Sequence, residues 1–276
     1  PGARGVRASV TGASTISSSS IPTVGGEGWT KAPRGSMATE AMFPRRGRGH
    51  EPGVPIVRLP GVFRPRSDTW LLADALREEA PPPEAALLDL CAGSGALAAE
   101  AVRLGVRDVT AVDRSRRAVA CCRLNGTLAG GRVRARRGDL FAAAGERRFD
   151  VIVSNPPYVP AESDPLPRRG RRRATDAGRD GRALIDRICA QVPGRLRPGG
   201  VLLLVQSSVA GVPHTLRALR AGGLRAEVVR RRPGPLGPLV ASRAAMLERR
   251  GLLAPGDRTE ELAVIRAAAP GGRRHG

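Results

Sequence analysis

The stretch LLDLCAGSGALA, residues 87–98, joins an apolar run to a helix-forming segment through a short turn that holds two glycines. Gly93 and Gly95 let the backbone bend sharply and come close to a ligand, because glycine adopts conformations that other residues avoid. A glycine turn alone is weak evidence, since many strand-to-helix turns use glycine only for packing. The stretch therefore predicts a buried strand, a tight turn and a helix, and the surrounding sequence must decide what the turn does.

Apolar strands and amphipathic helices alternate on both sides of this turn. Strands are expected at 85–90, 108–113, 132–140, 149–155, 200–206, 225–232 and 261–267. Helices are expected at 69–79, 96–105, 115–129, 180–196, 211–223 and 240–251. Buried parallel strands read as continuous apolar runs, and repeated strand–helix units build a doubly wound sheet. The sequence thus predicts an α/β fold with a Rossmann-like, doubly wound, mostly parallel seven-stranded sheet, which binds ligands at the carboxyl ends of its strands.

The composition separates a tail from a domain. Residues 1–52 are rich in Ser, Gly, Pro and Arg without a sustained apolar period, so we expect a disordered tail there and a folded domain at 53–270. The formal net charge of +21 would ordinarily indicate a nucleic-acid partner. Nearly all the basic residues are Arg, however, and Arg, Ala, Gly and Pro share GC-rich codons. Coding bias therefore explains the charge at least as well.

Cysteine and histidine usage excludes several kinds of site. The four cysteines form no CxxC pair and the three histidines do not cluster, so neither a metal site nor a disulfide framework is supported. Reduced thiols lead us to expect a cytoplasmic protein. No run of about 18 apolar residues occurs, so we expect no membrane contact.

Acidic residues end three of the predicted strands. Asp113 ends the second strand, about 20 residues after the glycine turn, where an acid can accept both hydroxyls of a ribose. Asp139 ends the third strand, near where an adenine amino group would lie. Asp89 ends the first and adds negative charge suited to an ammonium or a sulfonium. Helix capping or turn formation would explain one such Asp, but three acids at matching strand ends favour a binding site.

Together these features resemble the class I S-adenosylmethionine-dependent methyltransferases, in which an acid-plus-glycine loop, a ribose acid and an adenine-side acid recur in this order. The resemblance implies the class I methyltransferase fold and S-adenosyl-L-methionine as cofactor. The residues expected at the cofactor are Thr69, Asp89, Cys91, Ala92, Gly93, Gly95, Asp113, Arg114, Asp139, Leu140 and Asn155. Cys91 stands where the family usually has its first glycine, so we expect that this position need not adopt a glycine conformation.

The run DVIVSNPPYVP, residues 150–160, ends the fourth predicted strand beside this donor site. An amide or exocyclic amine nitrogen is a poor nucleophile, because its lone pair is delocalised. The Asn155 side-chain oxygen and the Pro156 carbonyl can accept its two N–H groups, and proline stiffens that carbonyl. Tyr158 can stack on the flat acceptor group. The predicted catalytic residues are therefore Asn155, Pro156, Pro157 and Tyr158, which act by positioning and preorganisation. A simple strand-terminating turn is the competing interpretation.

The Asn-Pro-Pro-Tyr turn does not identify the methyl acceptor, because methyltransferases of protein glutamine, adenine N6 and guanine N2 share it. Residues 61–76, GVFRPRSDTWLLADAL, resemble the segment that leads into the methyltransferase domain of the HemK/PrmC group. The matching residues are Arg64, Pro65, Asp68 and Thr69. This resemblance implies N5-methylation of a glutamine in a peptide-chain release factor or a related protein. Protein lysine methylation, methylation of adenine or guanine amines in RNA or DNA, and a non-catalytic donor-binding domain stay open as alternatives.

Two partners are expected besides the substrate protein. The chain resembles the short HemK-related branch that lacks an N-terminal helical domain, in which a small zinc-binding activator subunit can serve as partner. The loop after the motif carries a basic tract, Arg168, Arg169, Arg171, Arg172 and Arg173. This 168–173 tract either contacts RNA or the ribosome or is a solvated loop. Asp180 and Gly181, further along, are expected to open the next helix and to shape the acceptor cleft.

Overall fold

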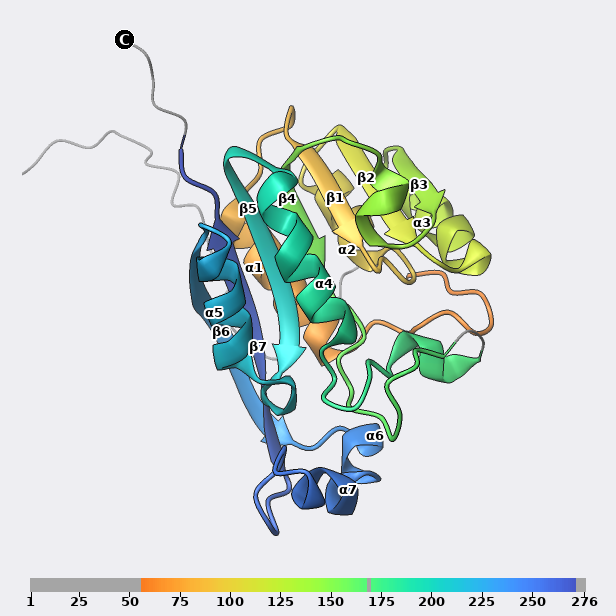
Figure 1. Ribbon diagram of the computed structural model, residues 1–276. Helices are drawn as coiled ribbons and strands as arrows, with labels where there is room; N and C mark the ends of the chain where they lie inside the picture. Colours follow the sequence, from red (N-terminus) through yellow and green to blue (C-terminus); the bar gives the residue numbers. More distant parts are fainter. Residues whose placement is uncertain (1–55, 168–169, 272–276) are drawn as a thin grey trace, which may run out of the picture. The chain divides into compact units, whose positions relative to one another are not determined.

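The computed structural model describes residues 56–167 and 170–271, which are built around one seven-stranded sheet (Figure 1). The strands are β1 (Ala86–Leu90), β2 (Asp108–Asp113), β3 (Val133–Arg137), β4 (Phe149–Ser154), β5 (Leu196–Ser207), β6 (Arg225–Pro235) and β7 (Thr259–Ala268). Their order across the sheet is β3-β2-β1-β4-β5-β7-β6. The first five pair in parallel, and β7 lies antiparallel to both β5 and β6. The predicted doubly wound, mostly parallel sheet is confirmed.

Helices cover both faces of the sheet. They are α1 (Ser67–Glu79), α2 (Ala96–Arg103), α3 (Arg116–Leu128), α4 (Ala183–Gln191) and α5 (Val212–Ala221). In Figure 1, α4 crosses in front of the sheet and α1 runs behind it. Successive strand residues point to opposite faces, so Leu87 of β1 packs in the core beneath α1 and α2, and Leu88 packs in the core beneath α4. Every residue of β1 is buried, as a strand covered on both faces requires.

The last predicted helix is wrong in one respect. The structure divides residues 240–251 between two short helices, α6 (Pro238–Ala241) and α7 (Ala244–Arg249). At the break, the Ser242 hydroxyl donates to the carbonyl of Leu239 at 2.8 Å, a local bond that competes with the helical pattern. The described ranges also contain four 3-10 turns that are too short to show a hydrophobic period in the sequence, namely η1 (Leu140–Ala144), η2 (Arg171–Ala174), η3 (Val192–Gly194) and η4 (Ser208–Ala210).

The predicted tail at 1–52 lies outside the described residues, so the boundary at residue 53 stays a prediction. None of the helices within the two described ranges combines the length and apolar character that crossing a bilayer requires.

Candidate active site

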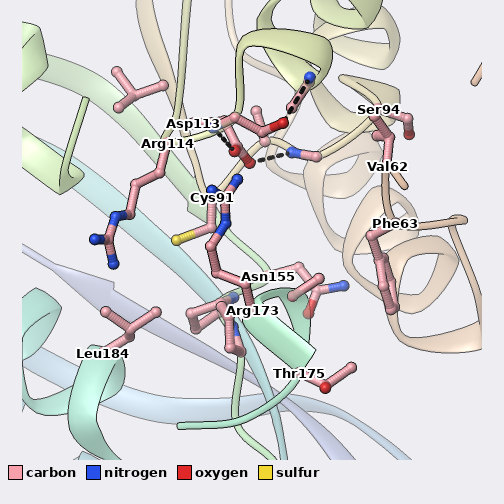
Figure 2. Close-up of a pocket in the computed structure, with 18 of the residues that line it drawn as sticks. Val62, Phe63, Cys91, Ser94, Asp113, Arg114, Asn155, Arg173, Thr175 and Leu184 are labelled. Atoms are coloured by element: carbon pink, nitrogen blue, oxygen red, sulfur yellow. Dashed lines mark hydrogen bonds between the residues drawn. The ribbon is translucent and has the colours of Figure 1, made fainter. Parts of the chain in front are cut away.

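A cavity lies where β1, β2 and β4 end, because the carboxyl ends of parallel strands meet at one edge of the sheet (Figure 2). All but two of the predicted site residues line it. Those that do are Thr69, Cys91, Ala92, Gly93, Asp113, Arg114, Asp139, Leu140, Asn155, Pro156, Pro157 and Tyr158. The two that do not are Asp89 and Gly95. The structure thus brings together residues as far apart in the chain as Asp68 and Tyr158, which are 90 positions apart.

Gly93 and Gly95 have different roles in the turn. Gly93 lines the cavity, where its missing side chain leaves the backbone open to a ligand. Gly95 has a φ of 78°, and a Cβ placed there would lie 2.6 Å from the Cα of Cys122 on α3. Gly95 therefore permits the close approach of α2 to α3, and its contribution to the site is indirect.

Cys91 corrects an expectation. Its φ is 58°, in the left-handed region that glycine favours and other residues enter at a cost. The fold thus keeps the conformation of the glycine that usually stands here, and the cysteine bears the strain. Burial, followed by the negative charges of Asp113 and Asp89, raises the pKa of the Cys91 thiol far above its ordinary value. The thiol is consequently a poor nucleophile.

Asp113 lies at the end of β2 and ties two turns together. Its Oδ2 accepts a hydrogen bond from the backbone N–H of Gly93 at 3.0 Å, and its Oδ1 accepts one from that of Ser115 at 2.7 Å. Burial raises the pKa of this carboxyl, although the two backbone bonds and the charges of Arg173 and Arg114 act in the opposite direction. The carboxyl still lines the cavity, so it can accept further hydrogen bonds from a ligand.

Asp89 lies beneath the cavity rather than on its wall. It is fully buried, and Oδ2 accepts a hydrogen bond from the N–H of Ala98 at 3.1 Å. Oδ1 has no hydrogen-bond partner among the described residues. Burial raises the pKa of Asp89 to about 8, so this carboxyl is mostly protonated at neutral pH in the absence of a cation. An ammonium or sulfonium nearby would lower that pKa again.

Asp139 follows β3 at the rim, and its carboxylate forms an ion pair with Arg187 of α4, with 2.8 Å between Oδ2 and Nη2. Both side chains are about two-fifths exposed, at 43% and 41%, so the pair leaves oxygen lone pairs accessible to a ligand. The next residue, Leu140, also has a positive φ, of 46°.

The Asn155-Pro156-Pro157-Tyr158 turn is held by side chains of α1, the first helix of the domain. The Asn155 side-chain nitrogen donates to Oγ1 of Thr69 at 3.1 Å. With its nitrogen engaged in this way, the amide presents Oδ1 as an acceptor; no donor reaches that oxygen within the described residues. Thr69, predicted as a cofactor contact, therefore also fixes which way the Asn155 amide faces.

Tyr158 is fixed in the same way by Asp68, to which sequence reasoning gave no role beyond its place in the resemblance. The phenolic hydroxyl donates to Oδ2 of Asp68 at 2.9 Å. Oδ1 of Asp68 accepts from the Thr69 backbone N–H at 2.6 Å. Burial and the neighbouring Asp68 raise the pKa of Tyr158 well above its ordinary value, so the phenol stays protonated. No local pattern could have revealed this pair, because its members are 90 residues apart.

The described part of the basic tract reaches the cavity wall. Arg173 lines it, and Figure 2 shows its side chain extending toward the turn that holds Cys91. Its charge partly opposes the rise that burial causes in the pKa of Asp113. Arg168 and Arg169 lie outside the described residues. Leu184 and Phe63, which sequence reasoning did not select, add apolar walls.

The cavity fits the cofactor that the resemblance implies. S-adenosylmethionine combines a ribose, a purine and two cationic groups, and the residues present offer carboxylates together with apolar side chains. The carboxyl of Asp113 is the most direct indication, since it lies on the cavity wall at the end of β2, where it can accept hydrogen bonds from ligand hydroxyls.

Comparison with known proteins gives a consistent answer. Residues 53–166 match the family described as the methyltransferase small domain. A Methanocaldococcus jannaschii protein, provisionally named a protein N5-glutamine methyltransferase, is 29% identical over 192 residues, which cover 70% of this chain and 95% of that protein. The release factor glutamine methyltransferase of Geobacter sulfurreducens is 39% identical over 158 residues. That alignment covers 55% of each protein, so the chain spans about half the length of this bacterial relative.

A solved structure agrees at the level of the fold. The E. cuniculi Mtq2–Trm112 complex, described as responsible for methylation of the eRF1 translation termination factor, aligns with a TM-score of 0.51 at 24% identity. The alignment covers 76% of this chain and 99% of that chain. Sequence, fold and the residues gathered at the cavity thus agree that the chain has the class I methyltransferase fold and is similar to the S-adenosylmethionine-dependent methyltransferases of the HemK/PrmC type.

Proposed function

We propose that this chain is an N-methyltransferase that modifies the N5 atom of a glutamine side chain in a peptide-chain release factor or a related protein. The observation that supports this most directly is the orientation of the Asn155 amide. Its nitrogen donates a hydrogen bond to Thr69, so its oxygen is left to accept a hydrogen bond from an N–H of the methyl-accepting group. A hydrogen-bond-accepting oxygen at that point suits a planar primary amide as substrate, because its nitrogen carries two N–H groups that can donate hydrogen bonds.

On the donor side, we assign the ribose hydroxyls to Asp113 and the adenine amino group to Asp139. The turn Cys91–Gly95 supplies backbone that can approach the donor closely. Thr69, Asp89, Arg114 and Leu140 complete the donor site, with Asp89 acting from below the cavity. These roles follow from the chemistry of each group and from its place on or beneath the wall.

On the acceptor side, Oδ1 of Asn155 and the carbonyl of Pro156 each accept one amide N–H, which turns the nitrogen toward the donor. Tyr158 offers its ring face to the flat amide. When bound, S-adenosylmethionine would supply a sulfonium methyl group: its carbon–sulfur bond breaks as the bond to the amide nitrogen forms, S-adenosylhomocysteine leaves as a neutral thioether, and the nitrogen gives up one proton to water. The protein residues contribute by in-line positioning and by preorganised acceptors, which need not rearrange during transfer.

The proposal is tested by incubating the chain with methyl-labelled donor and a release factor. A matched release factor in which the glutamine of its Gly-Gly-Gln motif is replaced serves as the control substrate. We expect label in the first protein and none in the second, and loss of labelling in the Asn155→Ala enzyme. Equal labelling of both proteins would show that another residue is the acceptor.

A nucleic-acid amine is the second candidate, and the observation that favours it is Arg173, a cation of the basic tract that reaches the cavity wall. RNase-sensitive labelling of total RNA, or labelling of DNA, in the absence of any labelled protein would establish it. Contact of the 168–173 tract with RNA or the ribosome is tested by repeating the RNA labelling at increasing salt concentration, because binding through phosphate contacts weakens steeply with salt.

We also propose a small activator subunit and a cytoplasmic site of action. The match to nearly the whole of a short archaeal relative supports the first, and the free state of all four cysteines is consistent with the second. Co-expression with a small zinc-binding partner should raise the yield or turnover of the enzyme, and an unchanged rate would count against an activator.

A further inference from the structure

The β6–β7 segment, residues 236–258, joins the last two strands of the sheet and carries α6 and α7. It matches none of the motifs above. We infer that Arg243 of this segment is a positioning residue for the acceptor half of the active site. The inference rests on the proposed function, because it concerns the loop that would hold the acceptor amide.

The β6–β7 segment packs directly on the acceptor loop. Val159, the residue after Tyr158, is buried in a cluster otherwise made by the segment and η4, with Val209, Leu236, Val240, Ala244, Met246, Leu247 and Leu253. Tyr158 itself packs against the same cluster. The apolar contacts thus anchor the loop, but they do not fix the orientation of its backbone, because hydrophobic contacts are non-directional.

Arg243 supplies the directional contacts. Its Nη1 donates to the carbonyl of Pro160 at 2.7 Å, and its Nη2 lies 3.0 Å from Oδ1 of Asp176. Both side chains are largely shielded from water, with 14% of Arg243 and 6% of Asp176 exposed. A rigid, planar guanidinium that reaches two partners fixes their separation more firmly than a lysine could.

The two partners of Arg243, Pro160 and Asp176, lie on two segments that an isolated β-bridge joins. Val159 pairs with Asp176 in an isolated parallel bridge, in which the Val159 N–H donates to Thr175 and the Ala177 N–H donates to Val159. Arg243 therefore ties the segment that follows Tyr158 to the segment that returns from the basic tract. Nearby, Arg250 donates to the carbonyls of Ala161, Glu162 and Arg179 and extends the same tie along the loop.

The loop has little room to move at Tyr158. A Cβ placed on Gly181, which has a φ of 76°, would lie 2.4 Å from the Tyr158 carbonyl oxygen and 3.1 Å from Pro160. A shift at Pro160 is therefore transmitted to Tyr158 rather than absorbed by empty space. Since a misplacement of about 1 Å can cost about 100-fold in rate, loss of the Arg243 contacts should reach the chemistry although Arg243 touches no substrate.

The test compares Arg243→Ala and Arg243→Lys with Arg258→Ala. Arg258 is the matched control, because it belongs to the same segment but pairs with Glu248 at the surface, where 59% of its side chain is exposed. Three quantities are measured: acceptor kcat and KM, the Kd of S-adenosylhomocysteine by calorimetry, and hydrogen exchange at the Val159, Ala161 and Ala177 amides.

In Arg243→Ala we expect acceptor kcat/KM to fall about 10- to 100-fold, the three amides to exchange faster, and the Kd to stay unchanged. Arg243→Lys should recover part of the loss, and Arg258→Ala should match the parent enzyme. Unchanged acceptor kinetics and unchanged exchange in Arg243→Ala would overturn the inference. If Arg243→Ala does not fold, Arg243→Lys and Arg250→Ala carry the same comparison.

The two proposals fail separately. If the parent enzyme methylates no release factor, the proposed function fails, whereas the exchange measurement still judges the role of Arg243. If the parent enzyme is active and Arg243→Ala keeps both its rate and its amide protection, the proposed function stands and the inference fails.

Discussion

The phenolic hydroxyl of Tyr158 donates a hydrogen bond to Oδ2 of Asp68, 2.9 Å away and 90 residues earlier in the chain. Beside this pair, the Asn155 amide donates to Thr69, the next residue after Asp68. Both anchors lie in the first turn of α1, whose apolar face is buried against the sheet. The Asn155–Tyr158 turn is therefore oriented by the first turn of α1 as well as by β4, the strand that it follows.

Tyr158→Phe keeps the aromatic ring and removes only the bond to Asp68. We expect kcat to fall about tenfold with an unchanged donor Kd, because a lost hydrogen bond to a carboxylate costs about 1.5–3 kcal/mol and only part of that reaches the transition state. Steady-state kinetics and calorimetry measure the two quantities. The double variant Tyr158→Phe/Asp68→Asn should lose little more than the single variants, and full additivity would contradict a direct interaction.

Thr69→Val keeps the shape of the side chain and removes the acceptor for the Asn155 amide. The amide would then rotate freely, so we expect kcat to fall toward that of Asn155→Ala, while Thr69→Ser, which keeps the hydroxyl, stays close to the parent enzyme. Calorimetry with S-adenosylhomocysteine separates two roles. A large change in the Kd of S-adenosylhomocysteine with an unchanged kcat would show that Thr69 contacts the methyl donor and does not orient Asn155.

The parts of the molecule that were predictable are those that local patterns encode. Strands such as 85–90 were visible because a strand covered on both faces is a continuous apolar run, and the acids Asp89 and Asp113 fall at strand ends where the fold class places ligands. Glycines and prolines marked the turns between them.

What could not be predicted depends on contacts between distant segments. The partners of Tyr158 and Pro160, namely Asp68 and Arg243, are 90 and 83 residues away from them in the chain, and no period or spacing links such positions before the topology is known. Cys91 was misjudged for a different reason: the turn lies between β1 and α2, and the backbone at Cys91 is left-handed although the residue there has a Cβ.

Cys91→Gly and Cys91→Ala separate the strain at this turn from the loss of the thiol. A left-handed conformation costs a residue with a Cβ about 1–2 kcal/mol, and the greater freedom of glycine in the unfolded chain offsets about 0.5–1 kcal/mol of that. We expect the glycine variant to be more stable than the alanine variant by about 0.5–1 kcal/mol. Urea unfolding of both proteins measures this difference, and a more stable alanine variant would argue against strain at Cys91.

Asp89→Asn tests the raised pKa of the buried carboxyl. In the folded chain the pKa is about 8, against 3.8 for the free side chain, so between these values the folded state holds a proton that the unfolded state has lost. Raising the pH through this window therefore favours unfolding of the parent protein, by at most about 1.4 kcal/mol per pH unit. Asparagine has no proton to lose and can still accept from the N–H of Ala98. We expect the unfolding free energy of the variant to exceed that of the parent by an amount that grows from about pH 4 to about pH 8 and is constant above it. Urea unfolding across this range checks the prediction, and stability curves that run parallel would show that Asp89 is ionised in the folded protein.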